Sequence, residues 1–173
     1  MKRNLILIGV SGVLIAFAVS GKAITWALID TKIRREFPAI RRITPAELAA
    51  WLRDPGRTPP LLLDVRTRPE YEVSHLATAQ HVEPSSPASA IDEPKDRPIV
   101  TYCSVGYRSG AFAERLRLAG FSSVANLEGS IFRWANEGYP VYRDGEKVKK
   151  VHPYNRFWGL LLRKKHRASA RQE

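Results

Sequence analysis

The residue in this sequence with the greatest capacity for chemistry is Cys103, the only cysteine among 173 residues. It ends the run 97–103, Arg-Pro-Ile-Val-Thr-Tyr-Cys, whose apolar and β-branched side chains predict a buried strand. A loop from Ser104 to Arg108, with Gly106 at its centre, leads to a helix predicted over residues 109–119. The thiol is therefore expected where a strand passes through a tight loop into a helix.

A thiol in that position is expected to be reactive. Unpaired N–H groups and the helix dipole favour negative charge at a helix N-terminus. Such surroundings lower a thiol pKa from about 8.5 to roughly 3.5–7.5, so we interpret Cys103 as a thiolate nucleophile. The alternative is an inert cysteine that packs as a small apolar residue. Its place at the carboxyl edge of the strand, where open α/β sheets bind ligands, favours the nucleophile.

The charge of the chain is concentrated at its two ends. Residues 1–42 carry a net charge of +6 and residues 143–173 a net charge of +7, whereas residues 43–142 carry −2, within a total of +11. A mildly acidic centre argues against a nucleic-acid-binding domain, which would carry the basic patch itself. A single cysteine excludes an intramolecular disulfide and a cysteine-based metal cluster. We expect no metal site and no cofactor.

The N-terminal segment is predicted to meet a membrane. Lys2 and Arg3 precede an apolar run over residues 5–21, which is an uncleaved single-span anchor, a cleaved signal peptide of a periplasmic or secreted protein, or a buried helix of a soluble protein. The anchor is the favoured interpretation. Basic residues follow the run, and charge is similar on both sides, so the orientation stays open. We divide the chain into residues 1–23 (anchor or signal), 24–39 (basic linker), 40–142 (catalytic domain) and 143–173 (basic tail).

Strands and helices alternate along the central domain. Short strands are predicted over residues 41–44, 61–65, 79–82, 98–103 and 122–127. Helices are predicted over residues 45–53, 68–74, 109–119 and 130–137, the first opened by a capping box at Thr44. This alternation predicts a parallel sheet with helices on both faces. In the tail, aromatic and leucine residues beside basic residues over 154–167 suggest either an interfacial helix or a solvated tail.

Four motifs in this domain resemble those of single-domain rhodaneses, which are sulfurtransferases. They are Leu-Leu-Asp-Val-Arg at 62–66, Glu-Tyr-x-x-Ser-His-Leu-x-x-Ala at 70–79, Cys-x-x-Gly-x-Arg-Ser at 103–109, and Leu-Glu-Gly-Ser with Trp134 and Gly-Tyr-Pro-Val over 127–141. The resemblance implies a parallel sheet of about five strands with the thiol at its carboxyl edge. It also implies that Cys103 attacks a sulfur donor and carries the outer sulfur as a persulfide.

The resemblance assigns roles to the residues around the thiol. The loop places four residues between Cys103 and Arg108, as in rhodaneses, whereas the related phosphatases place five. Backbone N–H groups of the loop are expected to hold the anionic sulfur. Arg108 either binds an anionic donor or fixes the loop by pairing with a carboxylate. The substrate-binding and loop residues are Ser104, Val105, Gly106, Tyr107, Arg108 and Ser109, and the supporting residues are Asp64 and Arg66.

Other residues in the motifs are given structural roles. Glu70 and His75 are interpreted as helix-terminal and packing groups, and Trp134 as a core residue. Ser74 stands where the family usually has glycine. If the helix stops there in the left-handed conformation, a non-glycine residue costs on the order of 1 kcal/mol.

The sequence thus predicts a membrane-anchored sulfurtransferase. Its partners would be a small sulfane-sulfur donor such as thiosulfate and a thiol acceptor, either a small molecule or a protein. The alternative is a rhodanese-type binding or redox-sensing module with little turnover. The physiological donor and acceptor and the oligomeric state stay open.

Overall fold

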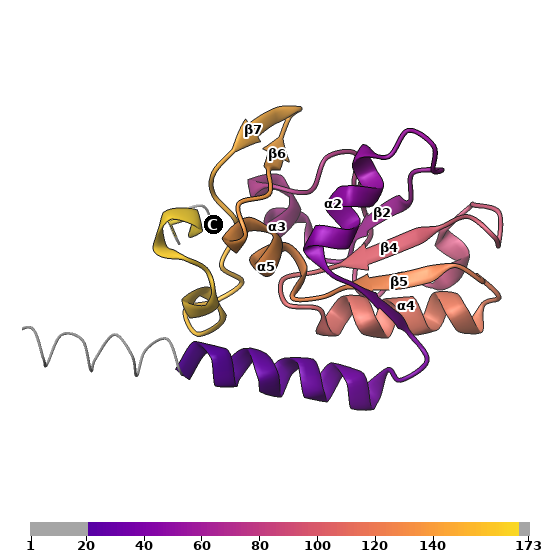
Figure 1. Cartoon of the computed structure of the whole chain (residues 1–173), viewed down its shortest axis with the longest axis horizontal. Helices are drawn as coiled ribbons and strands as arrows, with labels where there is room; N and C mark the ends of the chain where they lie inside the picture. Colours follow the sequence, from indigo (N-terminus) through magenta and orange to yellow (C-terminus); the bar gives the residue numbers. More distant parts are fainter. Residues whose placement is uncertain (1–20, 170–173) are drawn as a thin grey trace, which may run out of the picture.

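A five-stranded parallel sheet forms the centre of the computed structural model, which describes residues 21–169 (Figure 1). The strands lie in the order β1-β5-β4-β2-β3, so β4 occupies the middle of the sheet. They are β1 (Arg41–Ile43), β2 (Leu61–Asp64), β3 (Gln80–His81), β4 (Ile99–Tyr102) and β5 (Val124–Leu127). Asp64 and Tyr102 are register partners, which brings the carboxyl ends of β2 and β4 together. The predicted fold class is confirmed.

Helices cover both faces of this sheet. Alternate residues of β2 point to opposite sides, as the pleat of a strand requires. Leu62 packs in the cluster that holds α2 (Pro45–Arg53) and α5 (Ser130–Asn136), whereas Leu61 and Leu63 pack in the cluster that holds α4 (Tyr107–Leu118). The strands are buried on both faces, which explains why β2 and β4 are continuous apolar runs rather than alternating ones.

The helix starts follow the predicted capping chemistry. At the start of α2, the Thr44 hydroxyl accepts a hydrogen bond from the Glu47 N–H, and the Glu47 carboxylate accepts one from the Thr44 N–H. Thr67 and Glu70 form the same box at the start of α3 (Arg68–Val73). Glu70 is thus a helix-terminal residue, as predicted.

Ser74 corrects one expectation. Its backbone is extended, with φ −176° and ψ 155°, and not left-handed. Any residue adopts that conformation, so serine in place of the family's glycine carries no backbone strain here. The left-handed residue of this segment is Thr78, with φ 60°.

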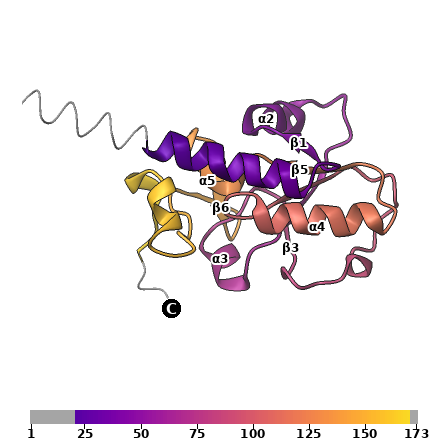
Figure 2. The same ribbon diagram turned by 90° about the horizontal axis from the view of Figure 1, so that it is seen from below.

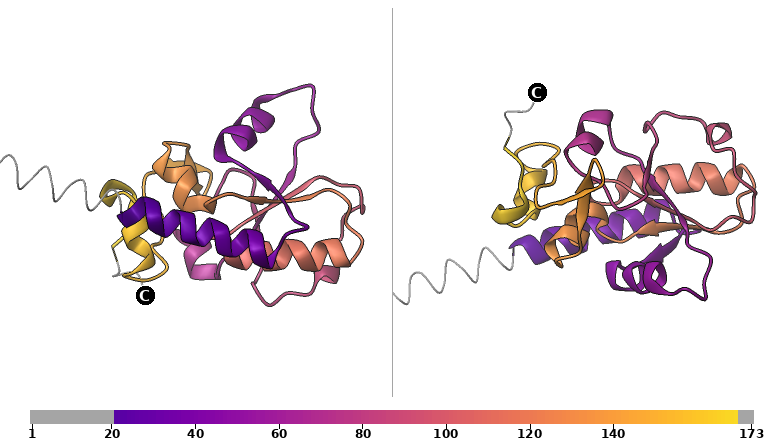
Figure 3. Two further views of the ribbon diagram at one scale, coloured as in Figure 1. Left: turned by 60° about the horizontal axis from the view of Figure 1, so that its bottom comes forward. Right: turned by 90° about the horizontal axis from the view of Figure 1, so that it is seen from above.

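A helix spans residues 21–36. It includes residues 24–36, which were predicted to be the first part of a basic linker. Figures 2 and 3 show this helix running beside α4. Its inner side chains lie three or four residues apart: Trp26 and Ile29 pack against the core, Ile33 is buried, and Phe37, just beyond the helix, contacts the Tyr107 ring. An ion pair of 2.9 Å between Asp30 and Arg133 ties the helix to α5.

The basic tail also packs onto the domain. The antiparallel hairpin of β6 (Val141–Arg143) and β7 (Glu146–Val148) turns at Asp144 and Gly145, both with positive φ. Beyond it, Val151, Leu161 and Leu162 are buried, and the Asn136 side chain donates a hydrogen bond to the Leu161 carbonyl. In place of an interfacial α-helix, the tail forms two short 3-10 helices, η2 (Trp158–Leu161) and η3 (Lys164–His166). A third, η1 (Ala88–Ala90), lies between β3 and β4.

The predicted membrane segment falls almost wholly outside this structure. Residues 1–20 are not among the described residues, so the anchor and the signal peptide both stay predictions. Between residues 21 and 169, no helix is both long enough and apolar enough to cross a bilayer.

Candidate active site

Cys103 directly follows β4, and the start of α5 fixes the backbone around it. The Cys103 N–H donates a hydrogen bond of 3.1 Å to the Ser130 hydroxyl. The Ile131 N–H donates to the Cys103 carbonyl, and the Phe132 N–H donates to the Ser104 carbonyl, both at 3.2 Å. The first residues of α5 therefore hold the backbone at Cys103 and Ser104 in place. The Cys103 residue is 1% exposed.

The loop curls so that its own backbone faces the sulfur. The Gly106 N–H lies 3.2 Å from Cys103 Sγ, within hydrogen-bonding distance of it. Gly106 has φ +113°, a conformation that L side chains rarely adopt, and a Cβ there would lie 3.2 Å from Ile33 Cδ1. The helix begins at Tyr107 rather than at the predicted residue 109, because Gly106 already acts as its N-cap. The N-terminus of the twelve-residue α4 thus begins next to the thiol.

Arg108 is held by a carboxylate from another element. Its guanidinium donates two hydrogen bonds of 2.8 Å to Glu70, one to each oxygen, and a third of 2.9 Å to the Ser104 hydroxyl. The Ser104 hydroxyl in turn donates to Glu70 at 2.9 Å. Glu70 is 2% exposed. These contacts favour the loop-fixing role of Arg108 over donor binding, because the fork that would grip an anionic donor is already occupied.

The charges around the sulfur favour its anionic form. Burial by itself raises the pKa of the Cys103 thiol, but the Arg108 guanidinium and the hydrogen-bonding groups of Ser109 and Gly106 outweigh it, so the pKa lies below its usual value. Glu70 stays ionised for a similar reason. Its burial opposes ionisation, but its hydrogen bonds to Arg108 and the charge of Arg108 lower the pKa of the carboxyl to about 2.

Ser109, Asp64 and Arg66 are buried and make side-chain hydrogen bonds. The Ser109 hydroxyl donates to the Asn126 side chain at 2.7 Å, and the Asn126 amide donates to the Gly106 carbonyl at 2.8 Å, which ties the loop to β5. Behind the loop, Arg66 donates two hydrogen bonds to Asp64, at 2.8 and 2.6 Å, and both residues are fully buried. This pair braces the loop after β2 and does not line the cavity above Cys103.

Half of the residues that line the cavity above the sulfur come from segments outside the central domain. The cavity has a volume of about 300 Å³. Helix 21–36 contributes Ile29, Lys32 and Ile33, and the tail contributes Tyr154 and Trp158. The active-site loop contributes the rest of the lining: Cys103, Ser104, Val105, Tyr107 and Arg108. Val105 and Tyr107, predicted as substrate-binding or loop residues, line the cavity.

Sequence reasoning missed three groups of residues at this site. The role of Glu70 in holding Arg108 was missed because Glu70 was interpreted only as a helix-terminal or packing group. The contribution of helix 21–36 was missed although Trp26, Ile29, Ile33 and Phe37 have helical spacing, a signal of a packed amphipathic helix. Tyr154 and Trp158 gave no signal, because only the folded tail brings them to the thiol.

A buried cysteine on a glycine loop at the carboxyl edge of a parallel sheet, with no base hydrogen-bonded to its sulfur among the described residues, is an arrangement typical of a cysteine nucleophile. The chain belongs to the rhodanese-like domain family, whose profile matches residues 44–137, more than half of its length. A sulfurtransferase of Allochromatium vinosum is 35% identical over 82 residues, which cover 47% of this chain and 77% of the relative. The thiosulfate sulfurtransferase GlpE of Pseudomonas fluorescens is 34% identical over 98 residues, covering 56% of this chain and 86% of GlpE.

Longer proteins also carry this domain. The probable adenylyltransferase/sulfurtransferase MoeZ of Mycobacterium tuberculosis is 39% identical over 101 residues, but the match spans only 25% of its length. Among solved structures, a rhodanese-like domain from Anabaena superposes with a TM-score of 0.54 at 27% identity, covering 60% of this chain and 80% of that domain. A rhodanese-like domain protein from Staphylococcus aureus, 24% identical with a TM-score of 0.53, shares the fold and covers 61% of this chain and 99% of its own.

Replacing Arg108 with glutamine is expected to shift the reactivity of Cys103 to higher pH. Removing the cation raises the thiol pKa, so less thiolate is present at neutral pH. The rate of Cys103 alkylation by iodoacetamide, followed over a range of pH, measures this shift. Arg117→Gln on the exposed side of α4 is the matched control, because Arg117 pairs only with Glu114 among the described residues. An unchanged alkylation profile in Arg108→Gln would contradict the assigned electrostatics.

Proposed function

We propose that this protein is a sulfurtransferase that moves sulfane sulfur through a persulfide on Cys103. The thiolate attacks the outer sulfur of a donor, a Cys103 S–S bond forms, and the rest of the donor leaves with the electron pair of the broken bond. A thiol then attacks the outer sulfur of the persulfide, and the Cys103 thiolate is released. The observation that carries the proposal is a buried, thiolate-stabilised Cys103 in a loop fixed by Glu70, Arg108 and Ser104.

The names of the relatives suggest one candidate sulfur donor. GlpE is named a thiosulfate sulfurtransferase, so thiosulfate is the reference donor for a first assay. The occupied Arg108 offers such an anion no free guanidinium fork. We therefore assign the capture of the outer sulfur to the loop N–H groups next to Cys103, with Gly106 the nearest of them.

Steady-state turnover distinguishes this enzyme from a binding or redox-sensing module. We expect repeated transfer of sulfur from a sulfane donor to a small thiol acceptor, because the thiolate is both the attacking and the leaving group. The assay measures how many moles of thiol persulfide are formed per mole of enzyme. A single stoichiometric event with no further turnover, for every donor and acceptor tried, would instead establish the sensing module.

We also propose that the protein is attached to a membrane by residues 5–21. The start of helix 21–36 lies beside η2 (Figure 1), where Gly21, Lys22 and Thr25 share a surface hollow with Phe157 and Leu160. The apolar side chains exposed at this end are Ile24, Leu28, Phe157 and Leu160. Exposed apolar residues beside a basic segment are typical of a surface that meets anionic lipid.

This proposal predicts that the full-length chain stays in the membrane pellet after an alkaline carbonate wash. A surface contact held by charge alone would be released by that treatment or by high salt. Raising the salt concentration from 0.1 M to 1 M shortens the Debye length from about 10 Å to about 3 Å and so weakens the attraction between exposed charges. N-terminal sequencing of the pelleted protein should find residues 1–23 intact. A mature species that begins near Gly21 or Ile24 and is free in the soluble fraction would establish the signal peptide instead.

A further inference from the structure

The cavity above Cys103 combines the catalytic thiol with walls that the rhodanese match does not include. The match covers residues 44–137, whereas Ile29, Ile33 and Lys32 come from before it and Tyr154 and Trp158 from after it. Helix 21–36 and the tail are both anchored to the domain, through the Asp30–Arg133 ion pair and the buried Leu161 and Leu162. The two segments therefore give this chain a substrate chamber of its own.

The cations that face this chamber are already paired. Lys32 forms an ion pair with Glu36 one turn further along the helix, and the Glu36 carboxylate also accepts a hydrogen bond from Tyr107. Arg108 is bound by both oxygens of Glu70 and lies 4.9 Å from the centre of the Tyr154 ring. Among the described residues that line the cavity, each cation thus has its own carboxylate. A doubly charged donor gains little from them, and it gives up its hydration on entering.

The rest of the wall is apolar. Ile29, Ile33, Val105 and Trp158 supply aliphatic and aromatic surface, and Tyr107 and Tyr154 add their rings at the rim, 39% and 46% exposed. A volume of about 300 Å³ is at the lower end of the range for small-ligand sites, roughly 300–1,000 Å³. The chamber is therefore of a size for one ring or a short branched chain, in contact with the sulfur.

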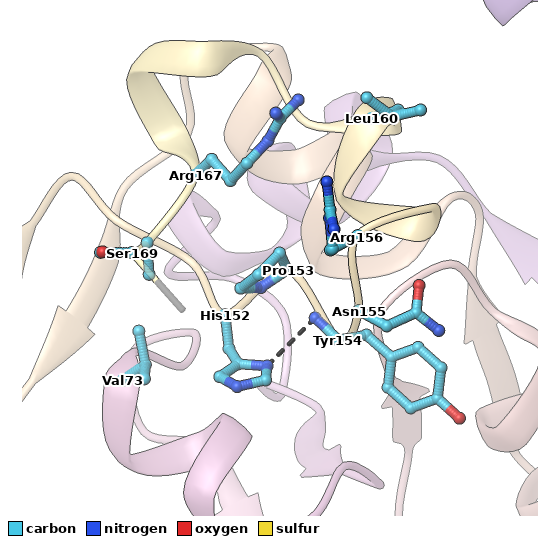
Figure 4. A pocket seen from close by; sticks show the side chains of 10 residues that line it. Val73, His152, Pro153, Tyr154, Asn155, Arg156, Leu160, Arg167 and Ser169 are labelled. Atoms are coloured by element: carbon cyan, nitrogen blue, oxygen red, sulfur yellow. Dashed lines mark hydrogen bonds between the residues drawn. The ribbon is translucent and has the colours of Figure 1, made fainter. Parts of the chain in front are cut away.

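A second pocket gives a contrast within the same molecule. It lies between α3 and the tail, and Figure 4 shows Arg156, Arg167, Asn155 and His152 among its labelled lining residues. Tyr154 lines both pockets, but Cys103 lines only the apolar one. Of the described tail residues, only the aromatic Tyr154 and Trp158 line the cavity that holds the thiol, whereas Arg156 and Arg167 line the second pocket.

We propose that the chamber binds the apolar organic body of a sulfur substrate, such as an aryl or branched-alkyl thiosulfonate, persulfide or thiol, in preference to inorganic thiosulfate. Ile29, Ile33 and Trp158 are the residues that determine this specificity. The inference rests on the proposed sulfur transfer, since it names the substrate class of the same site. Its driving force is the removal of apolar surface from water on both the ligand and the wall.

Sulfur transfer from such a donor to Cys103 needs no further reactant, oxidant or reductant. With benzenethiosulfonate, the Cys103 thiolate attacks the outer sulfur and forms the persulfide S–S bond. The bond between that sulfur and the sulfonyl sulfur breaks, and benzenesulfinate leaves with the electron pair. Methanethiosulfonate carries the same charge and reacts in the same way, with methanesulfinate as the leaving group. The two donors therefore differ in the size of the apolar group that the chamber would bind.

The test compares these two donors on the full-length chain. We expect kcat/KM to be about tenfold or more higher for benzenethiosulfonate, because burying a ring contributes at least the free energy of a tenfold change. Each value is divided by the rate of the same donor with a free small thiol, which removes any difference in intrinsic reactivity. Equal corrected values for the two donors, or a preference for methanethiosulfonate, would overturn the proposal.

Two neighbouring residues of helix 21–36 provide a matched pair of variants. Ile29→Gln puts a polar group into the chamber wall, whereas Leu28→Gln makes the same change at a position 66% exposed. Ile29→Gln should lower kcat/KM several-fold more for benzenethiosulfonate than for methanethiosulfonate, and Leu28→Gln should alter neither. Parallel losses for both donors in Ile29→Gln would overturn the specificity role. If no donor places sulfur on Cys103 in the wild type, the proposed function itself fails, and this inference fails with it.

Discussion

Replacing Cys103 with serine is expected to abolish sulfur transfer, with a loss of at least about 10³-fold in kcat/KM for every donor. A serine hydroxyl is not ionised at neutral pH, and the loop N–H groups and Arg108 then face a neutral atom in place of a thiolate. The chain has no second cysteine that could substitute for it.

The fold of this variant is expected to be intact. The Gly106 N–H lies 3.2 Å from the sulfur, and a hydroxyl fits the same space. Thermal unfolding of Cys103→Ser should therefore stay close to that of the wild type while transfer is lost. Residual turnover above a few per cent of the wild-type rate would mean that another group carries the sulfur.

The largest effect on stability is expected from Asp64→Asn. Arg66 is completely buried, and although burial alone would lower its pKa, the Asp64 carboxylate raises it, so the guanidinium is charged in the folded protein. Removing the carboxylate charge leaves that cation uncompensated in the core. Breaking a buried pair in this way costs about 3–5 kcal/mol, which urea unfolding of the full-length chain measures.

Two further variants test whether the loss of stability in Asp64→Asn comes from the unpaired buried cation rather than from the removal of any carboxylate. Glu72→Gln on the exposed side of α3 should change the unfolding free energy by no more than about 0.5 kcal/mol. The double variant Asp64→Asn with Arg66→Met should recover much of the loss, because it removes the stranded cation as well. An Asp64→Asn protein as stable as the wild type would show that the pair does not brace the sheet edge.

The strands, the helices of the central domain and the active-site loop were predictable because local signals determine them. The apolar run before Cys103 predicts β4, and the Thr44 and Glu47 pair predicts the start of α2. Gly106 predicts the tight loop, since its left-handed backbone is needed to turn the N–H toward the sulfur. Each of these features depends on residues within a few positions of one another.

Two of the unpredicted features of the site depend on contacts between distant segments. Glu70 reaches Arg108 across 38 positions, and nothing in the sequence near either residue signals the pair. Tyr154 and Trp158 reach the thiol only because Val151, Leu161 and Leu162 pack the tail against the domain. The conformation of Ser74 was wrongly expected because a family glycine suggested a left-handed residue, whereas the chain leaves α3 in an extended conformation.

The central claim is that Cys103 carries sulfur as a persulfide, and intact-protein mass spectrometry tests it most directly. The full-length chain is incubated with a sulfane donor in the absence of an acceptor, and the site is located by peptide fragmentation. We predict a gain of one sulfur atom on the peptide that contains Cys103, reversed by a thiol and absent in Cys103→Ser. A protein that stays unmodified with thiosulfate and with both thiosulfonates, while its thiol still reacts with iodoacetamide, would contradict the account.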